Sequence, residues 1–455
     1  LRLAAPALTA KYQQAELNGS FSLYVPLGDS LIEPQLNLLL GIQHLELVEQ
    51  KAFVPPGAAI EVSAWLNENL AAGQAKQASF LFSSSLENEP AVNSQTVQLY
   101  SDIQNADLTY LPDWPEITQL KASLMVDVPD VDVWVHKATT LGGELVPSST
   151  RIKVRTDKDN TSWLTLRGTL AGNASEGIKY FHQTPLQQQV SGALDTWRVE
   201  GPVVSELYAQ IPLSDRDKDL KIRLSSQLKG NDVDITDLGL SFEHIKGVVE
   251  FDSEIGLTAK GLQAAIFSGA VSADIQSVRA GTGFDIFIKA RGYAQSELIK
   301  QWQPLFIFKP ISGELDYTLD LQVRPLERGG LVLNIDSDLA GIEVATPLPF
   351  AKSPLQILPF HLSVKKARDL RIDFRYGDLA NGVVALEEGE LKRGQIYLGA
   401  TPSYLPSDDG LSIVGNIATE LDAKAWWDLW RSIKPTIGVE TQIKEKAAVL
   451  THINF

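Results

Sequence analysis

Carboxylate pairs are the residues of this sequence whose type and spacing come nearest to a catalytic arrangement. Asp127 with Asp130, and Asp232 with Asp234, could supply the acid and the base of a carbohydrate-active enzyme. That chemistry needs two carboxyl groups facing each other across a cleft at roughly 5–10 Å. The chain holds 56 Asp and Glu residues, so close acidic pairs are common and discriminate weakly. An enzyme on a β-architecture is therefore the least favoured of three hypotheses.

Motifs for nucleophilic, phosphate or metal chemistry are missing from the sequence. There is no Gly-Lys-Ser/Thr loop, no Gly-x-Ser-x-Gly elbow and no His-Glu-x-x-His pair. The six histidines are scattered, and the absence of Cys excludes thiolate ligands and cysteine nucleophiles. The acidic run at 215–219 resembles a calcium loop, but Arg216, Lys218 and Leu220 interrupt it. We expect no catalytic residue, no metal and no cofactor.

Composition narrows the class of protein further. Apolar residues make up 44% of the 455 residues, enough for a large buried surface. The net charge of −16 argues against a nucleic-acid partner, which would need clustered Lys and Arg. The longest apolar run, 36–42, is far shorter than the ~18 residues of a transmembrane helix. The start at Leu1 and the single Met125 indicate a trimmed segment, whose missing part could hold a membrane anchor.

Strands with one apolar face must carry whatever site the chain has. Residues 311–323 alternate apolar and polar side chains over thirteen positions, and 331–336 and 370–376 do the same. Parallel sheets covered by helices would show continuous apolar runs instead. The pattern therefore predicts a mainly β fold with mostly antiparallel sheet. Periodicity alone does not say whether the apolar rows face a closed core or an open space.

Helices are few in the predicted structure. We expect one near 58–74, ended by Gly73, a short one at 296–303 with Ser296 as N-cap, and one at 422–434 capped by Asp422. The last two follow a strand and a small-residue turn and carry Trp, which indicates a weak internal repeat. The predicted organisation is 1–105 with strands and the first helix, then segments 106–303 and 304–455, each ending in a helix, all within one continuous body.

Two apolar features allow a structural and a functional interpretation. The Trp-rich run 425–430 could be an interfacial anchor, but Trp426 and Trp430 suit one face of a helix packed on a neighbouring sheet. The proline-rich segment 345–354 could be a plain loop leaving a strand, or it could close or line a binding cleft.

Several collinear stretches resemble the YhdP family of AsmA-like proteins of Gram-negative envelopes, in its central periplasmic region. The most specific are Tyr-x-x-Asp-Trp-Pro at 110–115 and Ser-Asp-Leu-x-Gly…Pro-Leu-Pro-x-x-Lys at 337–352. Weaker matches lie at 53–74, 141–145, 182–186, 197–213 and 247–257. The resemblance covers most of the chain from about residue 50 onward, and its motifs are structural signatures rather than a catalytic set.

The resemblance implies an elongated, curved, open apolar groove, a β-taco, built from mostly antiparallel strands with a few short helices. It further implies a location in the periplasm, an inner-membrane anchor outside this chain, and transfer of phospholipid from the inner to the outer membrane. Partners would be phospholipid acyl chains, both membranes through the missing terminal parts, and envelope proteins. The residues expected to line the groove are Leu315, Tyr317, Leu319, Leu321, Leu331, Leu333, Ile335, Leu370, Ile372 and Phe374.

Lipid transport and a periplasmic interaction scaffold without lipid remain the two main hypotheses. A transporter should keep a continuous apolar face open to a cavity, whereas a scaffold should fill that space with side chains. Lipid transfer needs no nucleophile, because burial of acyl chains contributes about 0.8 kcal/mol per CH₂.

Overall fold

The architecture of the computed structural model is mainly β, as the alternating sequence predicts. It describes residues 1–27, 33–47, 70–86, 95–109, 114–141, 143–184, 196–213, 218–236, 239–281, 283–302, 304, 308–324, 329–367, 369–387, 390–416, 420–433 and 450–454. These residues form 26 strands and three helices. The chain divides into two compact units. Unit 1 comprises Leu1–Gln187, Pro202–Gln227 and Glu250–Glu254, and unit 2 comprises Gln188–Gly201, Leu228–Val249 and Ile255–Phe455.

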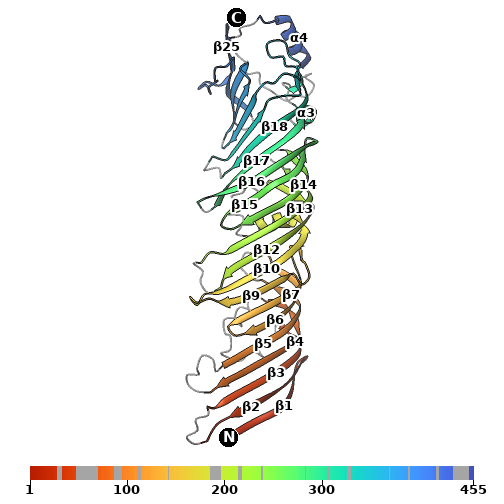
Figure 1. The fold of residues 1–455 in the computed structure, drawn as a ribbon, viewed down its shortest axis with the longest axis vertical. Coiled ribbons are helices and arrows are strands. Elements are labelled where there is room, and N and C mark those ends of the chain that lie inside the picture. The colour runs from red at the N-terminus through yellow and green to blue at the C-terminus, as the bar shows by residue number, and fades with distance from the viewer. Residues whose placement is uncertain are drawn as a thin grey trace. The chain divides into compact units, whose positions relative to one another are not determined.

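Unit 1 is an antiparallel meander in which successive strands lie side by side (Figure 1). Its strands are β1 (Arg2–Tyr12), β2 (Ala15–Tyr24), β3 (Gln35–Glu46), β4 (Leu70–Ser85), β5 (Gln95–Leu108), β6 (Ile117–Asp127), β7 (Asp130–Thr140), β8 (Gly143–Leu145), β9 (Thr150–Thr156), β10 (Ser162–Asn173) and β12 (Pro202–Pro212). The three-residue β8 fills the corner between β7 and β10, while β9 pairs with both strands over most of its length.

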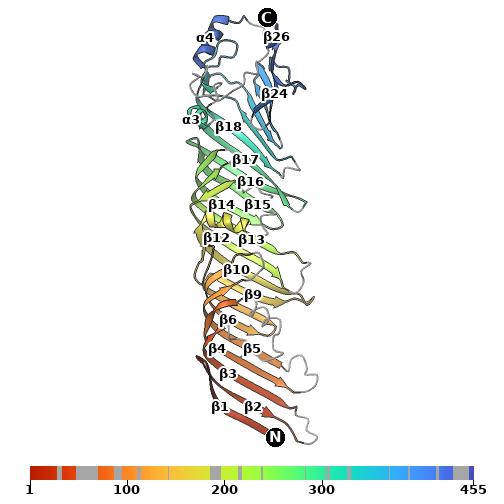
Figure 2. The same cartoon turned by 180° about the vertical axis from the view of Figure 1, so that it is seen from behind.

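Unit 2 continues the same pattern of hairpins, with its long strands side by side in Figure 2. Its strands are β11 (Trp197–Glu200), β15 (Gly256–Ile266), β16 (Gly269–Ala280), β17 (Gly283–Gln295), β18 (Ile311–Val323), β19 (Leu331–Ser337), β20 (Ile342–Val344), β21 (Phe360–Lys366), β22 (Leu370–Tyr376), β23 (Ala380–Glu387), β24 (Glu390–Leu398), β25 (Gly410–Asn416) and β26 (Leu450–Asn454). β13 (Lys221–Ile235) and β14 (Leu240–Asp252) contribute residues to both units. The β24–β25 and β25–β26 pairs are parallel.

Three helices follow strands and use aromatic side chains to pack. They are α2 (Ala174–His182), α3 (Ser296–Trp302) and α4 (Ala423–Ile433). Tyr180 of α2 meets Trp114 edge-on, with ring centroids 5.8 Å apart. The two helices predicted at 296–303 and 422–434 are confirmed, and the Ala425 N–H donates to Asp422 Oδ1 at 2.9 Å, as expected for the cap.

Two helix predictions are wrong in part. Residues 70–74 of the expected first helix belong to β4, and 58–69 lie outside the described residues. Gly73, predicted to end that helix, instead sits in the strand at φ +122°, where a Cβ would lie 2.7 Å from Ala106. Ser296 is the first residue of α3. Its hydroxyl is buried and makes no hydrogen bond within the described part of the chain, so it does not cap the helix.

Candidate functional site

The predicted lining residues of β18, β19 and β22 come together on one face of unit 2. Leu321 lies opposite Leu333, and Leu319 lies opposite Ile335. β21 lies between β19 and β22. Its Val364 is in register with Leu333 and Ile372, and its Leu362 is in register with Ile335 and Phe374. The ten predicted residues therefore share one surface, although the prediction omitted the strand that joins them.

Two apolar rows extend this surface across ten strands, from β15 to β19 and from β21 to β25, and together we call them the apolar strip. The first row is Ala259, Ile275, Ile288, Leu321, Leu333, Val364, Ile372, Val384, Gly394 and Leu411. The second is Leu262, Ala273, Ala290, Leu319, Ile335, Leu362, Phe374, Gly382, Ile396 and Ile413. At about 4.8 Å between strands, each row runs for roughly 43 Å. Side chains in register share a face, so the strip is apolar along its whole length.

Exposure separates this strip from an ordinary core. All ten predicted lining residues are half-buried, and none of them is fully buried. Their polar neighbours on the other face of β18, Glu314, Asp316 and Asp320, are exposed. A filled core normally buries long aliphatic side chains completely. The strip is thus an apolar surface that side chains of the protein cover only in part.

Unit 1 carries a similar apolar face that the sequence prediction did not include. One row contains Leu40, Phe80, Leu99, Val126, Val131, Val154, Leu164 and Ile211, on successive strands from β3 to β7 and then on β9, β10 and β12. Toward one end of these strands the face closes into a buried, alanine-rich cluster that includes Ala75, Ala106, Ala122 and Ala138. The small side chains allow tight packing at that end and leave larger, half-buried side chains elsewhere on the face.

Tyr317 is the polar interruption in the predicted wall of unit 2. It lies opposite Gly292, and a Cβ at that glycine would approach the Tyr317 hydroxyl to 2.9 Å, so the glycine makes room for the ring. Desolvation raises the pKa of the Tyr317 phenol to about 12. The environment above Gly292 is therefore poorly hydrated even though the ring is only half-buried.

The proline-rich loop 345–354 and α4 pack together beside the same face. Tyr376, two residues beyond Phe374 on β22, donates its hydroxyl to the Phe350 carbonyl at 3.1 Å. Trp426 of α4 meets the Phe350 ring edge-on at 5.8 Å and donates Nε1–H to the Leu348 carbonyl at 3.4 Å. The predicted packing role of the Trp-rich helix holds for Trp426, but its partner is the loop rather than a sheet.

Lys352, the lysine of the Pro-Leu-Pro-x-x-Lys motif, has a structural role. Its side chain is buried, and Nζ donates to the carbonyls of Leu339, Ile342 and Ser353 at 2.6, 2.8 and 3.0 Å. Desolvation lowers the pKa of its ammonium, while the charge of Asp338 acts in the opposite direction. Three carbonyl acceptors satisfy the ammonium fully, so the motif fixes the loop and offers no free group for chemistry.

The carboxylate pairs considered for catalysis are occupied by structural contacts. Asp127 accepts from Gln98 Nε2 at 3.2 Å, and Asp130 pairs with Arg155 at 3.2 Å. Asp232 accepts the His244 N–H at 2.9 Å, and Asp234 accepts the Ser241 hydroxyl.

The described ranges hold neither a cluster of metal ligands nor a helix that could span a membrane. No group of three His, Asp or Glu side chains there could hold a metal ion. None of the helices described is long and apolar enough to cross a membrane.

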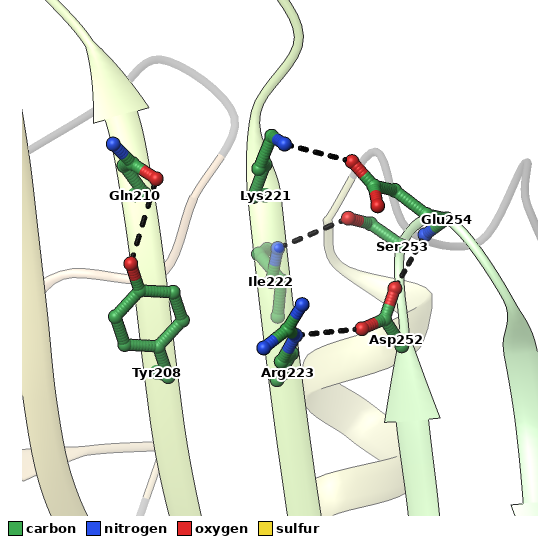
Figure 3. Close-up of a pocket in the computed structure, with 8 residues that line it drawn as sticks. All are labelled: Tyr208, Gln210, Lys221, Ile222, Arg223, Asp252, Ser253 and Glu254. Atoms are coloured by element: carbon green, nitrogen blue, oxygen red, sulfur yellow. Dashed lines mark hydrogen bonds and ion pairs between the residues drawn. The ribbon is translucent and has the colours of Figure 1, made fainter.

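A hollow in unit 1 is lined mainly by polar and charged side chains, unlike the apolar strip (Figure 3). Lys221 pairs with Glu254 at 2.9 Å and Arg223 with Asp252 at 2.8 Å along its wall. Its volume of about 160 Å³ is below the ~300 Å³ at which small-molecule sites begin. Each basic side chain is paired with a carboxylate across neighbouring strands, so these charges stabilise the strand packing and are not free to bind a ligand.

Comparison with known proteins places the chain in a family. The YhdP protein family matches residues 1–453. The intermembrane phospholipid transporter YhdP of Escherichia coli (strain K12) is 21% identical over 369 residues, which cover 78% of this chain and 28% of that protein. The chain thus spans well under a third of that relative's length, and no solved structure matches it. Because the family match runs over nearly the whole sequence, the chain belongs to the YhdP protein family.

Proposed function

We propose that this chain is a periplasmic segment of a conduit that carries phospholipid from the inner to the outer membrane. The acyl chains lie against the apolar strip, and the polar face of β18, with Glu314, Asp316 and Asp320, is turned to water. The strip would form the floor of a curved, open groove, and the membrane anchor would belong to another part of the full-length protein. Transfer along such a surface requires no catalytic step and no cofactor.

One observation carries the proposal: the apolar rows are continuous across ten strands, and sixteen of their twenty residues are half-buried rather than buried. A row of roughly 43 Å exceeds the ~30 Å hydrocarbon thickness of a whole bilayer. Acyl chains could therefore rest on it end to end or move along it without meeting a charged side chain. The name of the relative, an intermembrane phospholipid transporter, supports the same class of ligand.

Lipid content of the purified protein tests the proposal. The chain would be prepared without detergent from a Gram-negative host and analysed by native mass spectrometry, followed by uptake assays from vesicles with labelled phospholipid. We expect adducts with the mass of phospholipid and transfer of label to the protein. Protein that is free of lipid and takes up no label would overturn the proposal and leave a scaffold that binds only protein as the better account.

A further inference from the structure

Tyr317 places a phenol hydroxyl on the face of unit 2 that carries the apolar strip. The residue is two positions from Leu319 on β18, so the two side chains share that face about 6.7 Å apart. A Cβ on Gly292, its partner on β17, would approach the hydroxyl to 2.9 Å, so the ring reaches across that strand. On β17 the next residue of the same face is Ala290, a member of the second row. The hydroxyl thus borders the strip, within the width of two adjacent acyl chains.

The Tyr317 hydroxyl has no hydrogen-bonding partner among the described residues. A second phenol on this face behaves differently, because Tyr376 of β22 donates to the Phe350 carbonyl at 3.1 Å. Tyr317, Gly292 and Ala290 are each half-buried, so other side chains cover the space above them only in part. Buried phenols usually find a hydrogen-bond partner, so a molecule that covers Tyr317 has to supply an acceptor.

The surroundings of the hydroxyl favour a neutral acceptor over an anion. Its neighbours on this face of β16, β17 and β18 are all apolar, namely Val271, Ala273, Ala290, Ala294, Leu315 and Leu319. The first cation along the same face of β16 is Arg279, eight residues beyond Val271 and therefore ~26 Å away along the strand. A phosphate would find no counter-ion near the hydroxyl on these three strands. The poor hydration that raises the pKa of the phenol to about 12 would also penalise an anion there.

We propose that Tyr317 donates a hydrogen bond to an ester carbonyl of a bound glycerophospholipid and so fixes where the glycerol backbone rests on the strip. Hydrocarbon alone over the hydroxyl would remove its water without replacing the hydrogen bond, which is costly. The ester carbonyls are the neutral acceptors that adjoin the acyl chains, so one of them can meet the hydroxyl while the chains stay on the apolar rows. The inference rests on the proposed lipid function and adds the position of the lipid's polar–apolar junction.

Diester and diether forms of one lipid test this hydrogen bond. The whole chain, free of detergent, would be loaded from vesicles of equimolar diester and diether phosphatidylethanolamine with identical chains, and the bound lipid identified by mass spectrometry. An ether oxygen accepts more weakly than an ester carbonyl, so wild type should load the diester in about fivefold excess. Tyr317→Phe keeps the ring and should load both equally. Tyr293→Phe, which removes an exposed hydroxyl from the polar face of β17, is the matched control and should keep the wild-type preference.

The outcomes separate this inference from the proposed function. Equal loading of the two lipids by wild type, or a preference retained in Tyr317→Phe, overturns the Tyr317 contact but leaves the strip as the site of the acyl chains. An equal loss of preference in Tyr293→Phe also overturns it, because that hydroxyl lies on the other face of the sheet. No loading of either lipid refutes the proposed function itself.

Infrared spectroscopy of the loaded protein observes the ester carbonyl itself. In a lipid labelled with ¹³C at its ester carbonyls, the stretch of a hydrogen-bonded carbonyl lies at lower frequency than that of a free one. We expect a lower-frequency band in wild type that is lost in Tyr317→Phe, while urea unfolding gives the two proteins similar stability, since the hydroxyl bonds to no described residue. Identical carbonyl bands in the two loaded proteins would overturn the inference.

Discussion

A charge placed in the middle of the apolar strip should stop lipid while leaving the sheet folded. Leu319 lies in the second row, between Ala290 and Ile335, and is half-buried. In Leu319→Asp the carboxylate would remain hydrated, and the hydrated region would occupy about one strand spacing, ~4.8 Å, of the strip. An acyl chain lying across this position would lose apolar contact over about three CH₂ groups. At about 0.8 kcal/mol each, the loss is about 2.4 kcal/mol, or roughly fiftyfold in affinity.

The cost to folding should be smaller than the cost to lipid binding. A half-exposed leucine contributes about 1–2 kcal/mol by burial, and the new carboxylate can remain hydrated. Thr318→Asp adds the same charge one residue away, on the exposed polar face of β18, and serves as the matched control. Urea unfolding would report the stability of both variants, and uptake of labelled phospholipid would report their function.

The two possible environments of Leu319 give opposite results. If the strip is open, Leu319→Asp folds with a modestly lower free energy of unfolding and fails in uptake, and Thr318→Asp matches wild type. If the strip were a closed core, the buried carboxylate would cost several kcal/mol and the protein would unfold. Unfolding of Leu319→Asp, or normal uptake by a folded Leu319→Asp, refutes the reasoning.

Three further expectations follow from the described contacts. Lys352→Met removes three hydrogen bonds from the buried ammonium, although the Leu339 and Ser353 carbonyls each keep a backbone N–H donor, and it should lower the free energy of unfolding in urea by about 1–3 kcal/mol. Lys392→Met, which changes a more exposed lysine, should lower it by clearly less. Burial raises the pKa of Asp132, but hydrogen bonds from two arginines outweigh it, so the net shift is downward. The ionised Asp132 contributes about 1 kcal/mol to the free energy of unfolding; this contribution is complete above the unfolded pKa of about 3.9 and is lost as the pH falls through the lower pKa of the folded state. The difference in free energy of unfolding between wild type and Asp132→Asn should therefore disappear in acid, and a difference independent of pH would contradict this. The Tyr317 phenol should ionise near pH 12, and ultraviolet titration of Tyr317→Phe should lack one late-titrating tyrosine; loss of an early-titrating one would contradict desolvation at Gly292.

The strands of unit 2 were predictable because their signal is local. Alternation in 311–323 fixes which residues share a face, and a pairing register then only has to match apolar with apolar. β21 was missed although Leu362 and Val364 alternate with His361, Ser363 and Lys365, in a strand of the same length as the predicted β19 and β22. The half-exposure of the strip could not be predicted, since periodicity is identical for a covered and an uncovered face.

The helix errors have separate physical causes. α2 was overlooked although Asn173 and Glu176 make a capping box, in which the Asn173 side chain accepts the Ser175 N–H and Glu176 accepts the Asn173 N–H. Conversely, Gly73 looked like a helix end, but its positive φ serves a close approach to Ala106 from the neighbouring strand. That strand pairing is long-range information, which the local pattern does not contain.

Site-specific photo-crosslinking tests most directly whether lipid occupies the apolar strip. A photoreactive amino acid would replace Leu333 on the strip in one variant and Asp320, on the polar face of β18, in another, within the full-length protein in Gram-negative cells. The account predicts a phospholipid adduct at position 333 and none at position 320. Equal labelling of the two positions, or no lipid at position 333, would contradict it.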